Sequence, residues 1–113
     1  MTEPVLSSTE LRRLQQRYRQ LQAEVAQLGW IAQGSLLPNP PRAWRLTRKV
    51  QGKTVTLALS AAQAEAFAQA IANHRRLEAL LHQMRQLSEM ALLGSAPGVK
   101  KRPRPKPPKP PLT

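Results

Sequence analysis

The sequence predicts an α+β fold that is mainly α: a helix, a β-hairpin and a long second helix, followed by a disordered basic proline-rich C-terminal tail. Three observations lead to this prediction. Apolar residues recur at intervals of three and four near the start of the chain, and they alternate with polar residues in its middle. Alanine then dominates the start of a third segment. The first two patterns have the periods of a helix and of a strand, and alanine favours helix.

The first helix is expected over residues 7–29. Ser7 and Glu10 have the spacing of a capping box, in which each side chain accepts a hydrogen bond from the other residue's backbone. Gly29 is placed to end the helix in a left-handed conformation. The apolar residues between them follow a regular 3-4-3-4-3 spacing, which predicts a narrow seam that packs against another helix. The seam consists of Leu11, Leu14, Tyr18, Leu21, Val25 and Leu28.

A β-hairpin is expected next, with strands over residues 43–50 and 54–59. The segment before it, residues 30–42, is expected to be an irregular connection, since it contains Gly34, Pro38, Pro40 and Pro41. A two-residue Gln51-Gly52 loop sets apolar side chains opposite one another, whereas a loop one residue longer would oppose apolar to polar positions. The shorter loop pairs Val50 with Lys53, Leu46 with Leu57, Trp44 with Leu59 and Thr47 with Thr56.

The second helix is expected to begin at Ser60, with Gln63 as its reciprocal capping partner, and to end near Leu93. Its apolar band supplies further seam residues, which are Leu77, Leu81 and Met84. The two helices are expected to form an antiparallel pair. Two helices and one ribbon bury little as a monomer, so we expect a homodimer in a four-helix arrangement. The expected domain covers residues 7–93, between a disordered N-terminus (1–6) and a disordered tail (94–113).

The tail contains a cluster of positive charge. The chain has 18 lysines and arginines against 6 acidic residues, a net charge of +12. A flexible cationic arm attracts polyanions, and we expect a nucleic acid. An acidic membrane surface is disfavoured, because no aromatic or leucine residues stand beside the cations to insert. Two alternatives are a purely solubilising tail and a polyproline ligand (Arg102-x-x-Pro105-x-x-Pro108). The tail cations are Lys100, Lys101, Arg102, Arg104, Lys106 and Lys109.

The outer face of the hairpin is a second candidate for contact with nucleic acid. Arg45, Thr47 and Lys49 share this face, and Lys53 stands at the turn. No acidic residue occurs between positions 25 and 64. A two-stranded ribbon can enter a major groove, where short polar and cationic side chains suit phosphates and base edges. The alternative is an ordinary solvent-facing strand pair.

The other arginines are weaker candidates for a functional role. Arg12, Arg13, Arg17 and Arg19 flank the first seam and are expected to form a solvated helical face. Arg75 and Arg76 could clamp a phosphate, although Glu78 is close enough to neutralise part of their charge.

Catalysis is not expected. The chain has no aspartate and no cysteine, and its six glutamates are dispersed. His74 and His82 stand roughly 12 Å apart along a helix, too far for one metal ion. No glycine-rich phosphate loop is present. We therefore expect no enzymatic activity, no metal and no cofactor.

Four short segments resemble a bacterial family of short uncharacterised proteins. These segments are Leu28-Gly29-Trp30-Ile31, Gly34-Ser35-Leu36, the stretch 47–54 and the stretch 71–77. The resemblance implies a leading helix, a hairpin and a long helix, and a gene often found near transposases. Many members carry a Cys-Gly-rich segment before the hairpin. Residues 37–42 stand there in this chain without cysteine, so a metal role is not carried over.

Taken together, these patterns predict a small non-catalytic nucleic-acid-binding or mobile-element accessory protein, with electrostatic and weakly sequence-selective binding. The alternative is a coiled-coil-like module for protein interaction or oligomerisation, with a solubilising tail. The N-terminus lacks the features of a secretory signal, and no apolar stretch approaches the roughly 20 residues of a membrane span. A cytoplasmic location is therefore expected. The choice between DNA and RNA stays open.

Overall fold

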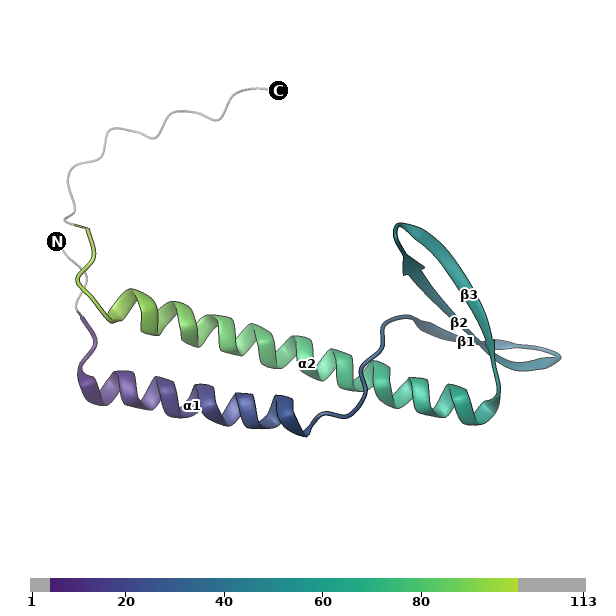
Figure 1. Ribbon diagram of the computed structural model, residues 1–113, viewed down its shortest axis with the longest axis horizontal. Helices are drawn as coiled ribbons and strands as arrows, with labels where there is room; N and C mark the ends of the chain where they lie inside the picture. Colours follow the sequence, from purple (N-terminus) through teal and green to yellow (C-terminus); the bar gives the residue numbers. More distant parts are fainter. Residues whose placement is uncertain (1–4, 100–113) are drawn as a thin grey trace, which may run out of the picture.

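The structure is a computed structural model that describes residues 5–99. Its elements are α1 (Ser8–Gln27), β1 (Ser35–Asn39), β2 (Arg42–Val50), β3 (Lys53–Leu59) and α2 (Ala61–Gly94). The strands form one antiparallel sheet in the order β1-β2-β3. Figure 1 shows α1 lying antiparallel to the C-terminal half of α2, while the sheet sits at the N-terminal end of α2. The predicted mainly helical α+β class is confirmed.

Both helices begin at the predicted capping boxes. The Oγ of Ser7 accepts a hydrogen bond from the backbone N–H of Glu10 at 3.1 Å, and the Glu10 carboxylate accepts one from the Ser7 N–H at 3.2 Å. Ser60 and Gln63 form the same reciprocal pair at 3.1 and 2.9 Å. These bonds satisfy amides that have no partner inside the helix, and so fix where each helix starts.

The predicted seam of α1 packs against α2. Leu21 is fully buried, and the five other seam residues are half-buried among exposed neighbours. From α2, Leu80 is fully buried, and the predicted seam residues Leu77, Leu81 and Met84 are half-buried. The antiparallel helix pair is therefore confirmed. Most of its apolar side chains stay partly in contact with water.

The end of α1 differs from the prediction. The helix stops at Gln27, and Leu28 leaves it in an extended conformation with φ −67° and ψ 141°. Gly29 is not among the residues with positive φ in the described part of the chain. An added Cβ at this position would lie 3.4 Å from the side-chain amide nitrogen of Asn73, which is an ordinary van der Waals distance. The expected left-handed cap at Gly29 is thus wrong, because the chain already leaves the helix at Leu28 in an extended conformation.

The hairpin between β2 and β3 has the predicted register, with Val50 opposite Lys53 and Leu46 opposite Leu57. Gln51 and Gly52 form its loop with φ values of 51° and 79°. A type I′ turn requires positive φ at both central residues, and it matches the twist of the two strands. The two-residue loop is therefore correct even though glutamine is an uncommon residue at its first position.

A third strand replaces part of the expected irregular connection. β1 pairs with β2 and sets Leu36 opposite Leu46 and Pro38 opposite Trp44. Proline is tolerated on an edge strand, where its missing N–H faces solvent. The segment was expected to lack regular structure because of its prolines. The structure instead uses it as the edge of a three-stranded sheet.

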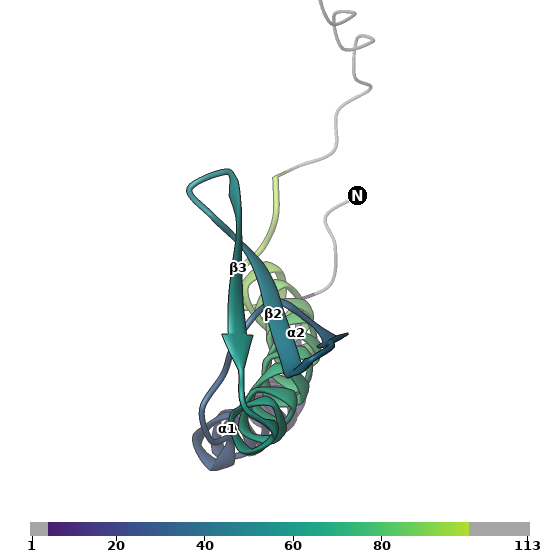
Figure 2. The same cartoon turned by 90° about the vertical axis from the view of Figure 1, so that its right-hand side faces the viewer.

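The sheet packs on the N-terminal half of α2 through one face. Leu46, Leu59 and Ala64 form a buried cluster, around which other apolar residues pack. Figure 2 looks along the helices and shows the sheet standing over α2. Alanine at position 64 lets the sheet backbone come close to the helix. The surrounding residues are Leu36, Trp44, Phe67 and Ile71.

The two ends of the described chain meet at the end of α2. The N–H of Leu6 donates a 3.0 Å hydrogen bond to the carbonyl of Gly94, and the Leu6 side chain lies where a Cβ of Gly94 would be. This contact joins two residues that lie directly outside the range 7–93. The predicted tail cations lie outside the described residues. Within residues 5–99, no helix has both the length and the apolar character needed to cross a membrane.

Replacing Gly34 with alanine is expected to destabilise the fold by about 1–3 kcal/mol. Gly34 has a φ of 141°, and an added Cβ would lie 2.8 Å from Cδ1 of Leu46 and 2.9 Å from the Thr47 carbonyl oxygen. Urea unfolding followed by circular dichroism measures the change. Gly98→Ala is the matched control, since a Cβ there meets nothing within 4 Å. Equal stability of the two variants would contradict this account of Gly34.

Candidate functional site

The polar face of the hairpin gathers the predicted cationic side chains through strand alternation. Arg45, Thr47 and Lys49 are alternate residues of β2, so their side chains point to one side of the sheet. The register sets Thr56 opposite Thr47 and Thr54 opposite Lys49 on that side. The other side of the sheet packs on α2. We use the name ribbon surface for Arg45, Thr47, Lys49, Thr54 and Thr56, together with Lys53 at the hairpin tip.

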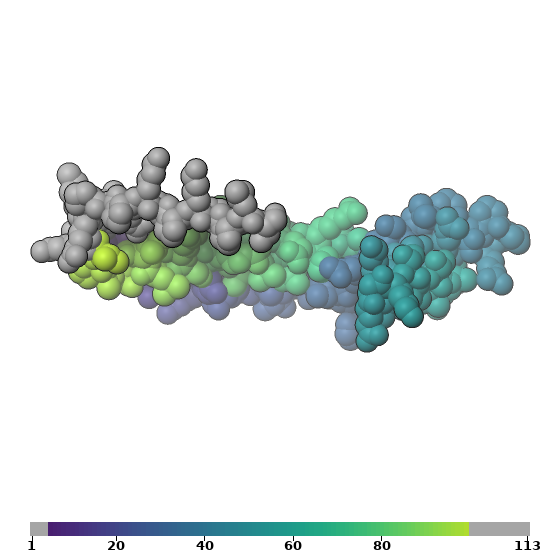
Figure 3. Space-filling model, turned by 90° about the horizontal axis from the view of Figure 1, so that it is seen from above, coloured from purple at the N-terminus to yellow at the C-terminus, as the bar shows by residue number. Residues whose placement is uncertain are grey.

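The ribbon surface is open to solvent. Arg45, Lys49 and Lys53 are exposed, as are both threonines of β3. Thr47 is half-buried, because it lies in the central strand and pairs with Ser35 of β1. None of the helices covers this face, and Figure 3 shows the sheet residues gathered at one end of the elongated molecule. A large ligand could therefore reach these side chains without any rearrangement.

The tip of the hairpin carries cations on both sides. Lys53 lies opposite Val50, so it shares the side of Leu46 and not that of Arg45. Arg48 is on the same side as Lys53 and is half-buried, with its Cβ near Gly34. As a result, the tip presents positive charge in two directions.

No carboxylate forms an ion pair with these cations within the described residues, although Glu65, at the start of α2, lies beside Leu36 and Trp44 at the same end of the molecule. Within residues 5–99, the ion pair of Arg76 with Glu24, at 2.7 Å, lies on the helices, as does a 3.7 Å contact between Nε2 of His74 and Glu78 that is an ion pair only when His74 is protonated. The cations of the sheet take part in neither. Uncompensated charges of one sign on a single end of a protein create a local potential that attracts polyanions.

Two of the arginines on the helices, Arg17 and Arg76, make contacts with other helix residues. Arg17 donates hydrogen bonds to Gln20 at 3.2 Å and to Gln83 of α2 at 3.3 Å. Arg76 is the partner of Glu24, which joins α1 to α2. Arg75 is exposed and lines a shallow hollow beside Gly34. These contacts favour a structural role for Arg17 and Arg76, so the predicted phosphate clamp at positions 75 and 76 keeps only one unpaired member within residues 5–99.

Residues 28–33 are tied to the middle of α2, an arrangement that the sequence did not indicate. The side-chain amide of Asn73 donates a 2.9 Å hydrogen bond to the carbonyl of Trp30. The N–H of Ala32 donates to the carbonyl of Ala70 at 3.1 Å, and the amide of Gln33 donates to Nε2 of His74 at 3.0 Å. We call these three bonds the clasp. Two of the four segments that carry the family resemblance therefore meet in space.

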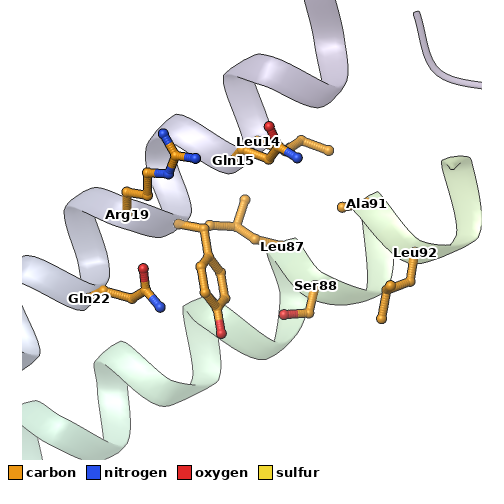
Figure 4. Close-up of a pocket in the computed structure, with 9 residues that line it drawn as sticks. Leu14, Gln15, Arg19, Gln22, Leu87, Ser88, Ala91 and Leu92 are labelled. Atoms are coloured by element: carbon orange, nitrogen blue, oxygen red, sulfur yellow. The ribbon is translucent and has the colours of Figure 1, made fainter. Parts of the chain in front are cut away.

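A second surface feature lies along the helix pair. An open groove of about 290 Å³ runs between α1 and α2, and its walls are mainly apolar. Figure 4 shows Leu14 and Arg19 on one helix and Leu87 and Leu92 on the other. The residues around it are Leu14, Gln15, Tyr18, Arg19, Gln22, Leu87, Ser88, Ala91 and Leu92. Two of these, Leu14 and Tyr18, belong to the predicted seam, so part of that seam stays accessible.

Comparison with known proteins found no match to a protein-family model, to a curated protein or to a solved structure. The family resemblance of the four short segments therefore stays a prediction. The six cations predicted in the tail lie beyond residue 99 and outside the described part of the chain.

Changing Asn73 to aspartate is expected to destabilise the fold by about 1–2 kcal/mol. The carboxylate cannot donate to the Trp30 carbonyl, and its charge repels that oxygen. Chemical denaturation measures the loss. Gln86→Glu makes the same amide-to-acid change at an exposed position of α2 and should stay within about 0.5 kcal/mol of the parent. A similar loss in both variants would show that added charge, and not the clasp, is responsible.

Proposed function

We propose that this chain is a small non-catalytic protein that binds nucleic acid electrostatically, with weak sequence selectivity, through the ribbon surface. The observation that carries the proposal is the exposure of Arg45, Lys49 and Lys53 on an end of the molecule where residues 5–99 supply no carboxylate partner. The family resemblance extends the proposal to a role as an accessory factor of mobile elements, acting in the cytoplasm.

The residues of the ribbon surface suit phosphate contacts better than base recognition. Lysine ammonium groups act as point charges, whereas the threonine hydroxyls are short and neutral. Arg45 is the one side chain of the outer face whose planar fork could pair with a guanine edge. Phosphate contacts position a protein but carry no sequence information. Affinity dominated by such contacts falls steeply with salt, because bound counterions are released.

The tail supplies a second cationic segment, which follows α2 in the sequence. The described chain leaves α2 at Gly94, whereas the sheet packs on the start of this 34-residue helix. A helix of this length spans about 51 Å. We propose that ribbon and tail contact separate stretches of the same nucleic acid. Since the two sites share no residue, their contributions to binding should add.

Replacing Arg45, Lys49 and Lys53 together with glutamine is expected to weaken binding to duplex DNA and to lower the slope of log affinity against log salt by up to about 3. Fluorescence anisotropy across salt concentrations measures both quantities. The control is Arg12→Gln, Arg13→Gln, Arg19→Gln, which removes the same charge from exposed positions of α1. Equal losses in the two triple variants would mean that net charge alone attracts the DNA.

Ending the chain after Val99 is expected to lower the same slope by up to about 5, because six cations are removed. This end point keeps the bond between Leu6 and Gly94 intact, so circular dichroism and thermal unfolding should match those of the full chain. Combining the truncation with the ribbon substitutions should abolish binding at physiological salt. The same measurements with single-stranded RNA test which nucleic acid is preferred. No binding of the full chain to either nucleic acid at low salt would reject the proposal.

The groove between α1 and α2 supports a second candidate function, a module for protein interaction. Its walls include Leu92, which is 74% exposed, and the adjacent Leu93 is 66% exposed. Exposed apolar side chains that cluster on a helix pair are typical of a docking surface. This function predicts that Leu92→Glu abolishes association with a protein partner while leaving anisotropy with DNA unchanged.

A further inference from the structure

β3 is an edge strand that lacks protection against further strand pairing. It pairs only with β2, and its residues from Lys53 to Ala58 are all exposed. The other edge of the sheet is protected, because β1 contains Pro38, which has no N–H to offer. β3 contains no proline. The sheet therefore has one blocked edge and one open edge.

The hairpin loop determines which groups of β3 face the open edge. In a two-residue hairpin the closing pair, here Val50 and Lys53, exchanges both backbone hydrogen bonds, and bonded pairs then alternate along the ladder. Alternate residues of β3 therefore direct their N–H and C=O groups away from β2. These residues are Thr54, Thr56 and Ala58. Within residues 5–99, no further backbone or side-chain hydrogen bond is formed to these groups.

The open edge also has an exposed apolar side. Val55 and Leu57 are 37% and 45% exposed, although they lie on the same side of the sheet as the buried Leu46. Figure 1 shows the reason: the hairpin tip rises away from α2, so the helix covers only the base of the ribbon. A second strand placed beside β3 would cover these two side chains.

We propose that β3 pairs antiparallel with β3 of a second copy of this chain, centred on Thr56, and so extends the sheet across the two copies. This register sets Thr56 opposite Thr56, Thr54 opposite Ala58 and Val55 opposite Leu57. The outward-facing N–H and C=O groups of one β3 strand then meet those of the other β3 strand. This pairing gives about six backbone hydrogen bonds. Val55 and Leu57 form the closely spaced non-bonded pairs, where side-chain contact is tightest.

A second copy fits this edge because the strand is complementary to itself. A register shifted by one residue would set Val55 against a threonine and move each apolar side chain to the wrong face. The two Lys53 residues would stand at opposite ends of the paired strands, about 20 Å apart, where their repulsion is weak. The inference is independent of the proposed function. If both hold, the polar faces of two ribbons join into one larger cationic surface.

Sedimentation equilibrium of the full chain is expected to show a dimer. Thr56→Pro removes an outward-facing N–H without breaking the ladder to β2, and should raise the dimer dissociation constant at least tenfold. Thr56→Val keeps the N–H and should remain dimeric. A monomeric parent chain, or a dimer that survives Thr56→Pro, would overturn the inference; the second result would favour a dimer through the helix groove.

A single introduced cysteine tests the register, since the chain has no cysteine of its own. Thr56→Cys should form a disulfide-linked dimer on mild oxidation, because the two Cα atoms would lie about 5.5 Å apart. Thr54→Cys is the control, because position 54 lies on the same edge and the same face as position 56. In the proposed register the two residues at position 54 would be about 13 Å apart along the strands. The Thr54→Cys variant should therefore stay monomeric on a non-reducing gel. Equal cross-linking of both variants would overturn the proposed register, whatever the DNA-binding assays show.

Discussion

Both halves of the molecule depend on packing against a single helix. Among residues 5–99, α2 is the element that covers the apolar side of the sheet, and the seam of α1 also packs on α2. The helix divides this task along its length, with Ala64 beneath the sheet and Leu80 beneath α1. Neither the sheet nor α1 would bury enough apolar area alone, because a lone hairpin or helix is marginal in water. The two halves are therefore stable only as long as α2 is continuous.

The clasp lies where these two packing regions meet. Trp30 and Ala32 are bonded to α2 at Asn73 and Ala70, directly between the sheet contacts and the α1 contacts. The connection thereby fixes how far α1 can slide along α2 and where β1 starts. This explains why Gly34 must follow so closely, since the chain has to turn from the helix surface into the sheet within a few residues. The position of the ribbon surface relative to the helices follows from these few bonds.

Most of the local structure could be predicted from the sequence because it depends on short-range rules. The capping boxes at Ser7 and Ser60 and the register around Gln51 each follow from neighbouring residues. β1 could not be predicted, because Pro38 opposes a strand unless a partner such as β2 leaves it on an edge. The bond from Asn73 to Trp30 was missed for a similar reason, since it joins residues 43 positions apart.

In the candidate site, too, some features follow from neighbouring residues in the sequence and others depend on distant ones. Alternation along β2 was enough to predict that Arg45 and Lys49 share a face, and the structure leaves that face open. The absence of acidic residues from positions 25–64 was also visible in the sequence. The predicted pairing of Val50 with Lys53 is confirmed, and it places Lys53 on the other side of the ribbon from Arg45. The open edge of β3 was hidden, because it follows from strand order.

The unusual setting of Trp30 has a practical consequence. Its indole is 90% exposed although its main chain is anchored to α2, whereas Trp44 is half-buried in the contact between sheet and helix. These are the two tryptophans of the chain. The protein thus carries a pair of intrinsic optical reporters with opposite surroundings. A ligand that shields the connecting segment would move the emission of Trp30 toward the blue, whereas melting of the sheet would move that of Trp44 toward the red.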